Sequence, residues 1–276
     1  FLMRKFFILS VLLFALLLLL PLTALTENPL STPVLAESAV PSKSSEFAEI
    51  PETFKIKITE TEKIVTLTRE EYLFGVIAGE MPALYEEEAL KAQADCAYTF
   101  LKWRQKENKN KEYDITDNYQ IDQCYISKSE ALRKWGSKAS EYEKKINSVI
   151  DSVAGQTLTF DGEIILSVYH AISGGSTESA KNVWGKDYPY LQSVSSIGDK
   201  LSPNYITTLS ATKEKIENGF QVTVPVGLKG TFTDFKLTEA GCVKTLKIAG
   251  KEFSGSKVRE ILGLKSANFN VSLKDD

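Results

Sequence analysis

The stretch YLFGVIAGEMPALYEEEALKAQADCAYTF, residues 72–100, predicts two helices that are separated by a Met-Pro pair. The first helix is expected to begin directly after Thr68, because Thr68 and Glu71 form a capping box. This helix should end near Gly79, since Pro82 disfavours the α conformation of the residue before it. The stretch therefore predicts a helix, a sharp break and a second helix.

The second helix is expected from about Tyr85 to Lys106. Its apolar residues recur at spacings of four, three and four, which is typical of a helix with one buried face. Several of them are small, so this face can pack closely against a neighbouring element. The stripe comprises Leu90, Ala94, Ala97 and Leu101.

The rest of the chain mixes strands and helices without a repeating βαβ order, which predicts an α+β fold with a mixed sheet and packed helices. Alternating apolar residues around a polar turn predict β-hairpins at 54–67 and 155–170, the second around Asp161-Gly162. Capping boxes predict one helix after Ser127 and another after Ser140. Residues 108–124 are expected to be loop, 210–219 and 255–263 helix, and 220–226, 231–237 and 242–250 strands.

Three segments of different composition divide the chain. Residues 1–25 contain a nearly uninterrupted apolar run behind Arg4 and Lys5. A spanning helix needs about 20 residues, so we expect a signal anchor rather than a cleaved peptide, with the N-terminus in the cytoplasm. Residues 26–52, rich in Ser, Pro and Glu, are expected to form a flexible linker. The chain should then cross the cell membrane once, and the folded domain, 53–276, should lie on the extracytoplasmic side.

The balance of charges and the cysteine count exclude several classes of protein. The net charge is −3, and lysines are dispersed among acidic residues, so no nucleic-acid partner is expected. Three widely spaced cysteines and a single histidine lack the spacing of metal ligands, so neither a metal nor another cofactor is expected. We expect Cys96 and Cys242 to be small buried thiols.

Four glutamates in the opening stretch raise the question of which one carries chemistry. Glu86, Glu87 and Glu88 occupy the first turn of the second helix, where the helix dipole favours carboxylates, and need no catalytic role. Glu80 instead lies at the negative end of the first helix, among Gly, Ala, Met and Pro residues. Helix carbonyls and apolar neighbours both favour the protonated form that a general acid needs. A surface glutamate pointing into water is the ordinary alternative, and the charge pattern alone favours that alternative.

The opening stretch strongly resembles the core motif of the stage II sporulation protein D family, whose domain also occurs in bacterial amidase enhancers. The shared elements are a Tyr-Leu-x-Gly-Val start, a small-Glu-Met-Pro centre and an Ala-Leu-Lys-Ala-Gln-Ala helix. The resemblance continues in YHAISGGSTESAKNVWGKDYPYLQSV, residues 169–194, and covers most of the chain from Phe54 onward.

The resemblance implies a murein lytic transglycosylase that acts during sporulation engulfment on glycan strands freed of stem peptides. Glu80 matches the family's catalytic acid. One carboxyl group suffices, because it protonates the oxygen between MurNAc and GlcNAc and then takes the proton of the sugar's C6 hydroxyl, which closes a 1,6-anhydro ring. Water is not the nucleophile, so the second carboxylate of a hydrolase is unnecessary. The implied partners are peptidoglycan glycan strands, a sporulation amidase and a membrane partner of the engulfment complex.

The second motif is expected to line the substrate cleft. It contains a sharp turn whose hydroxyls and exposed backbone can approach a ligand. It also contains aromatic rings with flat faces for sugars, although such rings commonly pack in a core. The turn comprises Ser173, Gly174, Gly175, Ser176 and Thr177, and the rings are Trp184, Tyr188 and Tyr190. A nucleophilic triad of His170 with Ser173 or Cys96 is a weaker alternative.

The chain also departs from the family pattern. Tyr98 stands where the family usually has an arginine, and Asp95 replaces a small apolar residue. Cys124 lacks the nearby cysteine and histidine that suit some members to a metal, so no zinc is expected. The chain ends before a Gly-His-Gly-Val-Gly-Met-Ser-Gln segment, so we expect a domain truncated at its C-terminus. The absence of this segment favours two alternatives: a non-catalytic peptidoglycan-binding activator of an N-acetylmuramoyl-L-alanine amidase, or an inert wall-binding scaffold.

Overall fold

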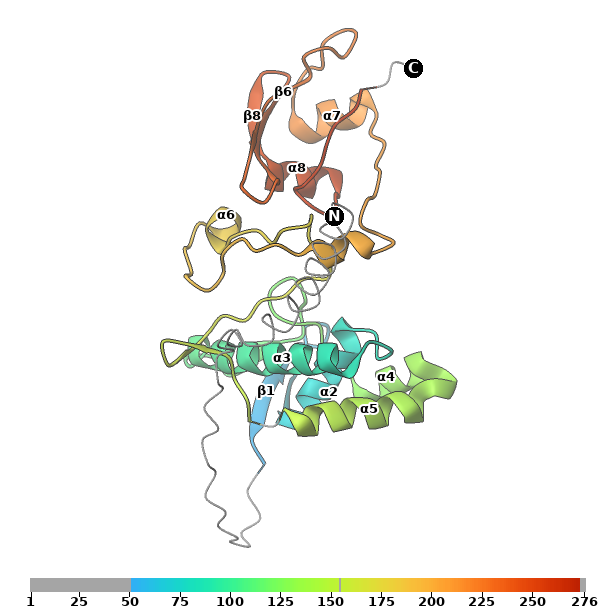
Figure 1. Ribbon diagram of the computed structural model, residues 1–276, viewed down its shortest axis with the longest axis vertical. Coiled ribbons are helices and arrows are strands. Elements are labelled where there is room, and N and C mark those ends of the chain that lie inside the picture. The colour runs from blue at the N-terminus through green and yellow to red at the C-terminus, as the bar shows by residue number, and fades with distance from the viewer. Residues whose placement is uncertain (1–50, 154, 274–276) are drawn as a thin grey trace, which may run out of the picture. The chain divides into compact units, whose positions relative to one another are not determined.

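The computed structural model of the chain describes residues 51–153 and 155–273 (Figure 1). The predicted anchor at 1–25 and nearly all of the predicted linker at 26–52 lie outside these residues. Within the described part of the chain, none of the helices combines the length and apolar composition that crossing a membrane requires.

A mixed sheet and four helices form the first part of the fold. Strands β1 (Thr53–Lys57) and β2 (Ile64–Thr68) form the predicted antiparallel hairpin, and the short β3 (Ile115–Thr116) pairs with β1 in parallel. Helices α2 (Arg69–Glu80) and α3 (Glu87–Glu107) are the two helices predicted from the opening stretch. They pack with α4 (Lys128–Trp135) and α5 (Ala139–Ser152). The α+β class is therefore confirmed.

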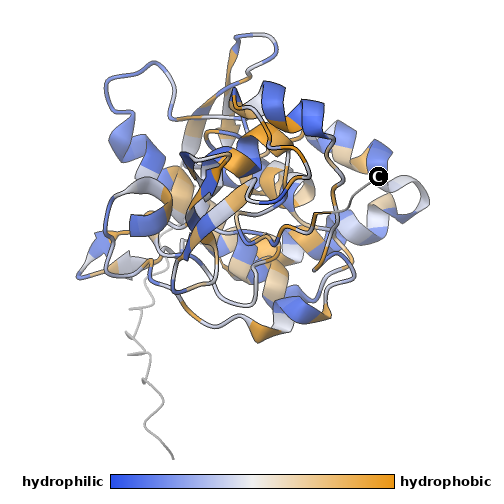
Figure 2. Cartoon of the chain, turned by 90° about the horizontal axis from the view of Figure 1, so that it is seen from above, coloured by the Kyte–Doolittle hydropathy of each residue, from blue (hydrophilic) through white to orange (hydrophobic). Residues whose placement is uncertain are grey.

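The core of this part lies between the helices and β1. The predicted stripe of α3 is fully buried, as are most residues of α2. Figure 2 shows hydrophilic and hydrophobic residues alternating along the helices, as expected for elements that bury one face. Thr68 and Glu71 form the predicted capping box, and so do Ser127 and Glu130 at the start of α4.

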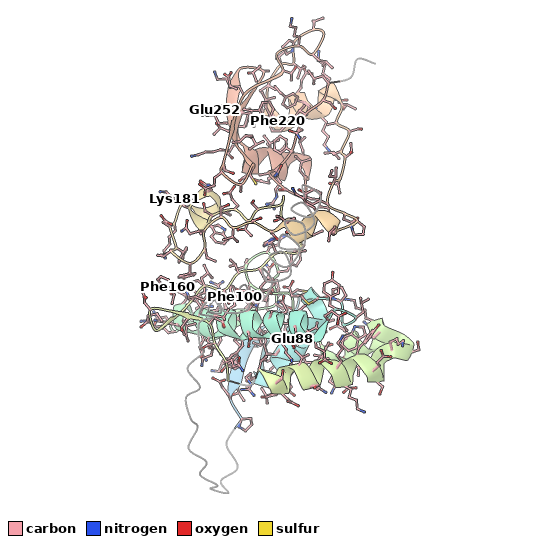
Figure 3. All side chains as sticks on the ribbon, in the orientation of Figure 1. Glu88, Phe100, Phe160, Lys181, Phe220 and Glu252 are labelled. Atoms are coloured by element: carbon pink, nitrogen blue, oxygen red, sulfur yellow. The ribbon has the colours of Figure 1, made fainter. Side chains whose placement is uncertain are left out.

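The remaining elements include a second core. Strands β4 (Thr159–Phe160) and β5 (Glu163–Ile164) form the predicted hairpin, and the turn residues Asp161 and Gly162 both have positive φ. Helix α6 (Ala180–Trp184) follows. Helices α7 (Lys213–Phe220) and α8 (Gly255–Leu262) pack with the antiparallel sheet of β6 (Phe232–Leu237), β7 (Val243–Ile248) and β8 (Lys251–Ser254). Figure 3 labels Phe100 and Phe220, which belong to the first and second cores respectively.

Two local predictions are wrong, and two short strands were not predicted: β3, within the predicted loop at 108–124, and β8. Ser140 caps no helix, because a 3₁₀ turn at Gly136–Lys138 brings the chain into helical geometry before it. Residues 220–226 form no strand, since the Val224 amide donates to the Glu217 side chain and the segment folds back on α7. Strand β8 was not predicted, because its turn places Ala249, a residue that rarely adopts positive φ, at +48°.

Two glycines of α2 allow the segment after the 108–124 loop to lie directly against this helix. A Cβ atom at Gly75 would stand 2.3 Å from the Tyr125 ring and 2.6 Å from the Ile126 carbonyl oxygen. A Cβ atom at Gly79, one turn later, would stand 3.0 Å from the Cys124 Sγ atom. The missing side chains therefore leave the space in which residues 124–126 pack.

We expect Gly75→Ala to lower the free energy of unfolding by roughly 1–3 kcal/mol, because the added methyl group overlaps backbone and ring atoms in a packed site. The measurement is urea denaturation of the full chain. Gly198→Ala is the matched control, since a Cβ there meets no described heavy atom within 4 Å. Equal stability of the two variants would contradict the close packing at Gly75.

Candidate functional site

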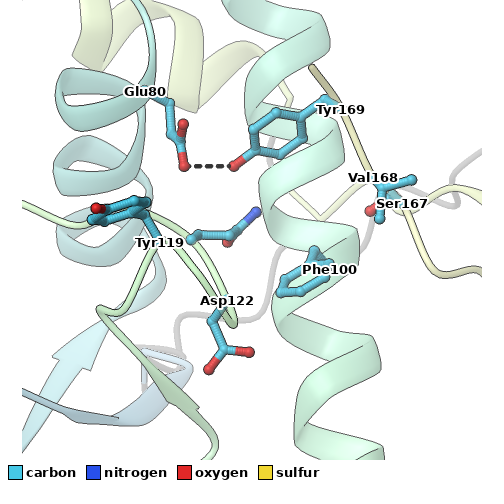
Figure 4. A pocket seen from close by; sticks show the side chains of 8 residues that line it. Glu80, Phe100, Tyr119, Asp122, Ser167, Val168 and Tyr169 are labelled. Carbon is cyan, nitrogen blue, oxygen red and sulfur yellow. Dashed lines mark hydrogen bonds between the residues drawn. The ribbon is translucent and has the colours of Figure 1, made fainter. Parts of the chain in front are cut away.

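Glu80 is the last residue of α2 and lines a pocket of about 230 Å³ (Figure 4). Its side chain is solvent-exposed, whereas Ala78 and Ala83 turn into the core. The expectation that apolar neighbours desolvate Glu80 is therefore wrong. The pocket is lined by Glu80, Phe100, Tyr119, Asp122, Gln123, Ser167, Val168 and Tyr169.

The two oxygens of the Glu80 carboxyl group have different surroundings. Oε1 accepts a hydrogen bond from the Cys124 backbone amide at 2.8 Å and another from the Tyr169 hydroxyl at 3.1 Å. Oε2 accepts no hydrogen bond from the described residues. Because both donors favour negative charge on Oε1, a proton on this carboxyl group belongs on Oε2. Oε2 is also the oxygen that remains available to a ligand.

The fold itself brings the first of these donors to Glu80. Gly79 lets Cys124 lie against the end of α2, and this contact places the Cys124 amide beside the carboxylate. The loop before Cys124 is held by Asp122, whose Oδ2 accepts from the Thr116 amide at 3.0 Å and hydroxyl at 2.7 Å. The loop is therefore a fixed wall of the pocket.

Tyr169 supplies the second donor from the segment that follows β5. Burial, and then the charge of Glu80, raises the pKa of Tyr169 far above its ordinary value. The hydroxyl therefore keeps its proton throughout the neutral range and remains a donor to Glu80. Figure 4 shows this hydrogen bond crossing the pocket.

Asp122 is the other carboxylate that lines the pocket, but its oxygens are already engaged. Oδ1 pairs with the Arg104 guanidinium, and Oδ2 accepts the two hydrogen bonds from Thr116. The Asp122 side chain is 1% exposed. It therefore holds the loop in place and is not positioned as a second acid or base.

The predicted turn at residues 173–177 does not contribute to this pocket. The Ser173 amide donates to Asp199, the Gly175 amide to the Ser173 hydroxyl and the Thr177 amide to the Val194 carbonyl. Gly175 adopts a φ of +100°, as a sharp turn requires. Three of the backbone donors expected to meet a ligand are thus used within the protein. Ligand binding by this turn, including Gly174 and Ser176, stays a prediction.

The predicted aromatic rings also lie away from the pocket lining. Tyr188 and Tyr190 pack against the first core, and the Tyr190 ring contacts Phe160 at 5.5 Å between centroids. Trp184 is 54% exposed on α6. Sugar binding by these three residues is therefore also a prediction that the geometry leaves open.

The triad alternative finds no support in the geometry. His170 Nε2 lies 3.9 Å from an Asp199 oxygen, and among the described residues it makes no hydrogen bond to Ser173 or Cys96. The three cysteines are half-buried free thiols. In the part of the chain that the structure describes, no group of three His, Cys, Asp or Glu side chains could hold a metal ion.

Of the eight residues that line the pocket, only Glu80 was predicted from the sequence as a site residue. Tyr169 is the first residue of the second motif, and its place in that motif is the sequence feature that could have marked it as a site residue. Tyr119 and Gln123 lie in the polar loop, where no periodicity marks a residue as functional. Tyr119 is 71% exposed at the pocket, which makes it the aromatic ring best placed to meet a ligand.

Comparison with known proteins agrees with the resemblance seen in the sequence. The family model "Stage II sporulation protein" matches residues 57–160. "Stage II sporulation protein D" of Bacillus subtilis (strain 168) is 36% identical over 232 residues, which is 82% of this chain and 66% of the relative. The protein of the same name from Bacillus amyloliquefaciens is 35% identical over 227 residues, 80% of this chain and 65% of the relative.

A further relative carries a different name. The "Amidase enhancer" of Bacillus subtilis (strain 168) is 27% identical over 188 residues, which is 68% of this chain and 24% of that protein. The chain thus spans just under two thirds of the length of the two stage II sporulation relatives and about a quarter of the enhancer.

We expect Glu80→Gln to speed the alkylation of Cys124 by iodoacetamide about two- to fivefold near pH 8. Burial raises the pKa of the Cys124 thiol, and the negative charge of Glu80 raises it further. Removing that charge lowers the thiol pKa and increases the reactive thiolate. Peptide mass spectrometry measures the rate, with Cys242 as the internal control because its charged neighbour is Glu178. An unchanged ratio of the two rates would contradict a charged Glu80 beside Cys124.

Proposed function

The chain belongs to the stage II sporulation protein D family, and from this premise we propose that it is a lytic transglycosylase of peptidoglycan. It cleaves the bond between MurNAc and GlcNAc in glycan strands that have lost their stem peptides. The observation that supports this proposal most is the asymmetry of Glu80, whose Oε1 accepts two hydrogen bonds whereas its Oε2 accepts none from the described residues.

The reaction uses Glu80 twice. As an acid, it gives the proton on Oε2 to the glycosidic oxygen while the bond from that oxygen to the anomeric carbon of MurNAc breaks. The carboxylate then takes the proton of the MurNAc C6 hydroxyl, whose oxygen bonds to the same anomeric carbon and closes the 1,6-anhydro ring. Proton and leaving group balance, and the enzyme returns to its starting form.

The hydrogen bonds on Oε1 serve the first half of this cycle, in which the carboxyl group gives up its proton. After the proton has left, the Cys124 amide and the Tyr169 hydroxyl stabilise the carboxylate without occupying the oxygen that must act as the base. Because the nucleophile is part of the substrate, no further carboxylate is needed to activate water. Asp122, the other carboxylate of the pocket, is already bonded to Arg104 and Thr116, which agrees with a mechanism that uses one carboxyl group.

The proposed function also implies a location, at the cell membrane and facing the cell wall. The apolar run in residues 1–25 holds the protein on the membrane, and the domain meets the cell wall on the extracytoplasmic side during engulfment. An amidase removes the stem peptides before this protein acts. The amidase and a membrane protein of the engulfment complex are therefore the proposed partners.

A second candidate function rests on the relative named "Amidase enhancer". In that case the domain binds peptidoglycan and stimulates an N-acetylmuramoyl-L-alanine amidase without cleaving glycan itself. Both functions place the same chain on the cell wall, and the products formed distinguish them.

We expect the full chain to release fragments ending in 1,6-anhydroMurNAc from peptide-free glycan strands, and Glu80→Gln to slow this release about 10²–10⁴-fold, because the amide cannot transfer a proton. Mass spectrometry of the products is the measurement. Glu87→Gln is the matched control, since it removes an equal charge from the first turn of α3 and should leave the rate unchanged.

Two outcomes of this experiment would contradict catalysis by Glu80. If the parent chain leaves the glycan intact but increases the turnover of a purified amidase on whole peptidoglycan, the protein is an activator. Equal product release by the parent and Glu80→Gln would instead remove Glu80 from the chemistry.

We also expect Tyr119→Ala to raise KM for glycan strands about fivefold and to change kcat little, because a ring contact is worth roughly 1 kcal/mol of binding. Steady-state kinetics with strands of defined length provide the test. Tyr113→Ala, in the same loop but outside the pocket lining, serves as the control. A loss in kcat at constant KM would show that Tyr119 does not act as a binding platform.

A further inference from the structure

The turn at residues 173–177 is covered by a segment that follows it in the chain, residues 196–206, which we call the strap. The strap contains the 3₁₀ turn Ile197–Leu201 and is otherwise irregular. Hydrogen bonds join it to the turn at residues 173–177. They run from the Ser196 amide to the Gly175 carbonyl at 3.0 Å, from the Tyr205 hydroxyl to the Gly174 carbonyl at 2.8 Å, and from the Ser173 amide to Asp199 Oδ2 at 2.8 Å.

The glycines of the turn leave space that other segments fill. A Cβ atom at Gly175 would stand 2.9 Å from the Lys200 Cε atom and 3.3 Å from the Tyr205 hydroxyl oxygen, both of which belong to the strap. A Cβ atom at Gly174 would stand 2.3 Å from the Nδ2 atom of Asn268, which follows α8. The backbone that was expected to meet a ligand is therefore covered by side chains of the protein itself.

The strap directs polar groups toward the turn and apolar side chains toward solvent. Leu201 is 88% exposed, Ile206 80% and Ile197 69%. Asp199 and Tyr205, which hold the turn, are partly buried. Burial of apolar surface is the main stabilising term in folded proteins, and the three exposed side chains add little of it. Because the strap is held by hydrogen bonds that water can replace, we expect its free energy of local opening to be low.

The groups with which the strap occupies the turn are also those of a peptide-free glycan strand. The Tyr205 hydroxyl corresponds to a sugar hydroxyl, and the Ser196 N–H corresponds to that of an acetamido group. Asp199 corresponds to the lactyl carboxylate, which MurNAc carries as a free acid only after its stem peptide has been removed. Once the strap opens, each of these sugar groups can form the hydrogen bond that the strap forms in its closed position.

The turn lies within reach of a glycan bound at Glu80. Ser173 follows Tyr169 by four residues, so the Cα atoms of these two residues lie at most about 14 Å apart. The Tyr169 hydroxyl itself donates to Glu80 Oε1 at 3.1 Å. A glycan strand is an extended polymer, so a strand that places a glycosidic bond at Glu80 can continue to the turn.

We propose that the strap is an autoinhibitory cover of a glycan-binding site at the Ser-Gly-Gly turn, and that a peptide-free glycan strand displaces it. The identity of the ligand rests on the proposed function, whereas the contacts that close the strap lie within the protein. The strap and the glycan compete for the same peptide groups. A change that weakens the closed strap therefore tightens glycan binding, and bound glycan opens the strap.

Tyr205→Phe tests this competition, since it removes a hydroxyl that holds the closed strap. We expect the dissociation constant for peptide-free glycan strands to fall about two- to fivefold, because one closing hydrogen bond is lost. The measurement is isothermal titration calorimetry on the full chain carrying Glu80→Gln, so that the strands stay intact. Tyr113→Phe is the matched control and should leave the constant unchanged. Among the described residues the Tyr113 hydroxyl forms no hydrogen bond, and its ring contacts Lys57 and Lys111.

Hydrogen exchange followed by mass spectrometry measures the opening of the strap and needs no activity. We expect Tyr205→Phe to speed exchange in peptides that cover residues 196–206. Added glycan strands should also speed exchange in these peptides of the Glu80→Gln chain. Strand β7 (Val243–Ile248) is the internal reference, because its buried residues should exchange alike in all samples.

The outcomes separate the strap from the proposed function. A dissociation constant that is unchanged or higher in Tyr205→Phe, strap exchange that glycan does not speed, or a failure of glycan to bind overturns the proposal. If the parent chain releases anhydro product while its strap does not respond to glycan, the proposed function stands and the cover falls. If the strap responds as expected while no anhydro product forms, the cover stands and the proposed transglycosylase activity falls.

Discussion

The close approach of α2 to residues 124–126 is the contact on which the site depends. Gly75 and Gly79 lack the side chains that would keep this segment away, and the space they leave receives the Tyr125 ring and Cys124. The Cys124 amide then reaches Glu80 at the exposed end of the helix. The buried Tyr72 hydroxyl donates a hydrogen bond to Gln123, which lines the same pocket as Glu80. The two glycines of α2 thus allow the packing that places a hydrogen-bond donor on Glu80 Oε1.

The site that results is asymmetric rather than strongly charged. Its second carboxylate, Asp122, is committed to Arg104 and Thr116, and its phenol, Tyr169, is kept protonated by burial and by Glu80. A carboxyl group with one oxygen fixed and the other open can give and take a proton at one place without moving. That property suits a reaction in which the same group acts first as an acid and then as a base.

Much of this fold could be predicted from the sequence, and the reasons for success and failure are physical. Periodicity and capping located α2, α3 and α4, and the Asp-Gly turn located the β4–β5 hairpin. Ser140 was misread because a 3₁₀ turn precedes it, and β8 was missed because its turn uses an alanine at positive φ. Glu80 was singled out by its motif, whereas its hydrogen-bond donors Cys124 and Tyr169 come from distant segments that only tertiary packing brings together. The pocket's exposed ring, Tyr119, lies in a polar loop without any pattern. Of the rings that the sequence suggested, Tyr188 and Tyr190 pack against the first core and Trp184 is exposed outside the pocket lining.

The most direct test of the central claim is a crystal structure of the full chain with a bound disaccharide that ends in 1,6-anhydroMurNAc. We expect the C6 or leaving-group oxygen of the bound sugar to lie about 2.6–3.2 Å from Glu80 Oε2. We also expect Oε1 to keep its hydrogen bonds from the Cys124 amide and the Tyr169 hydroxyl. A sugar bound away from this pocket, or one that displaces those two donors to reach Oε1, would contradict the central claim.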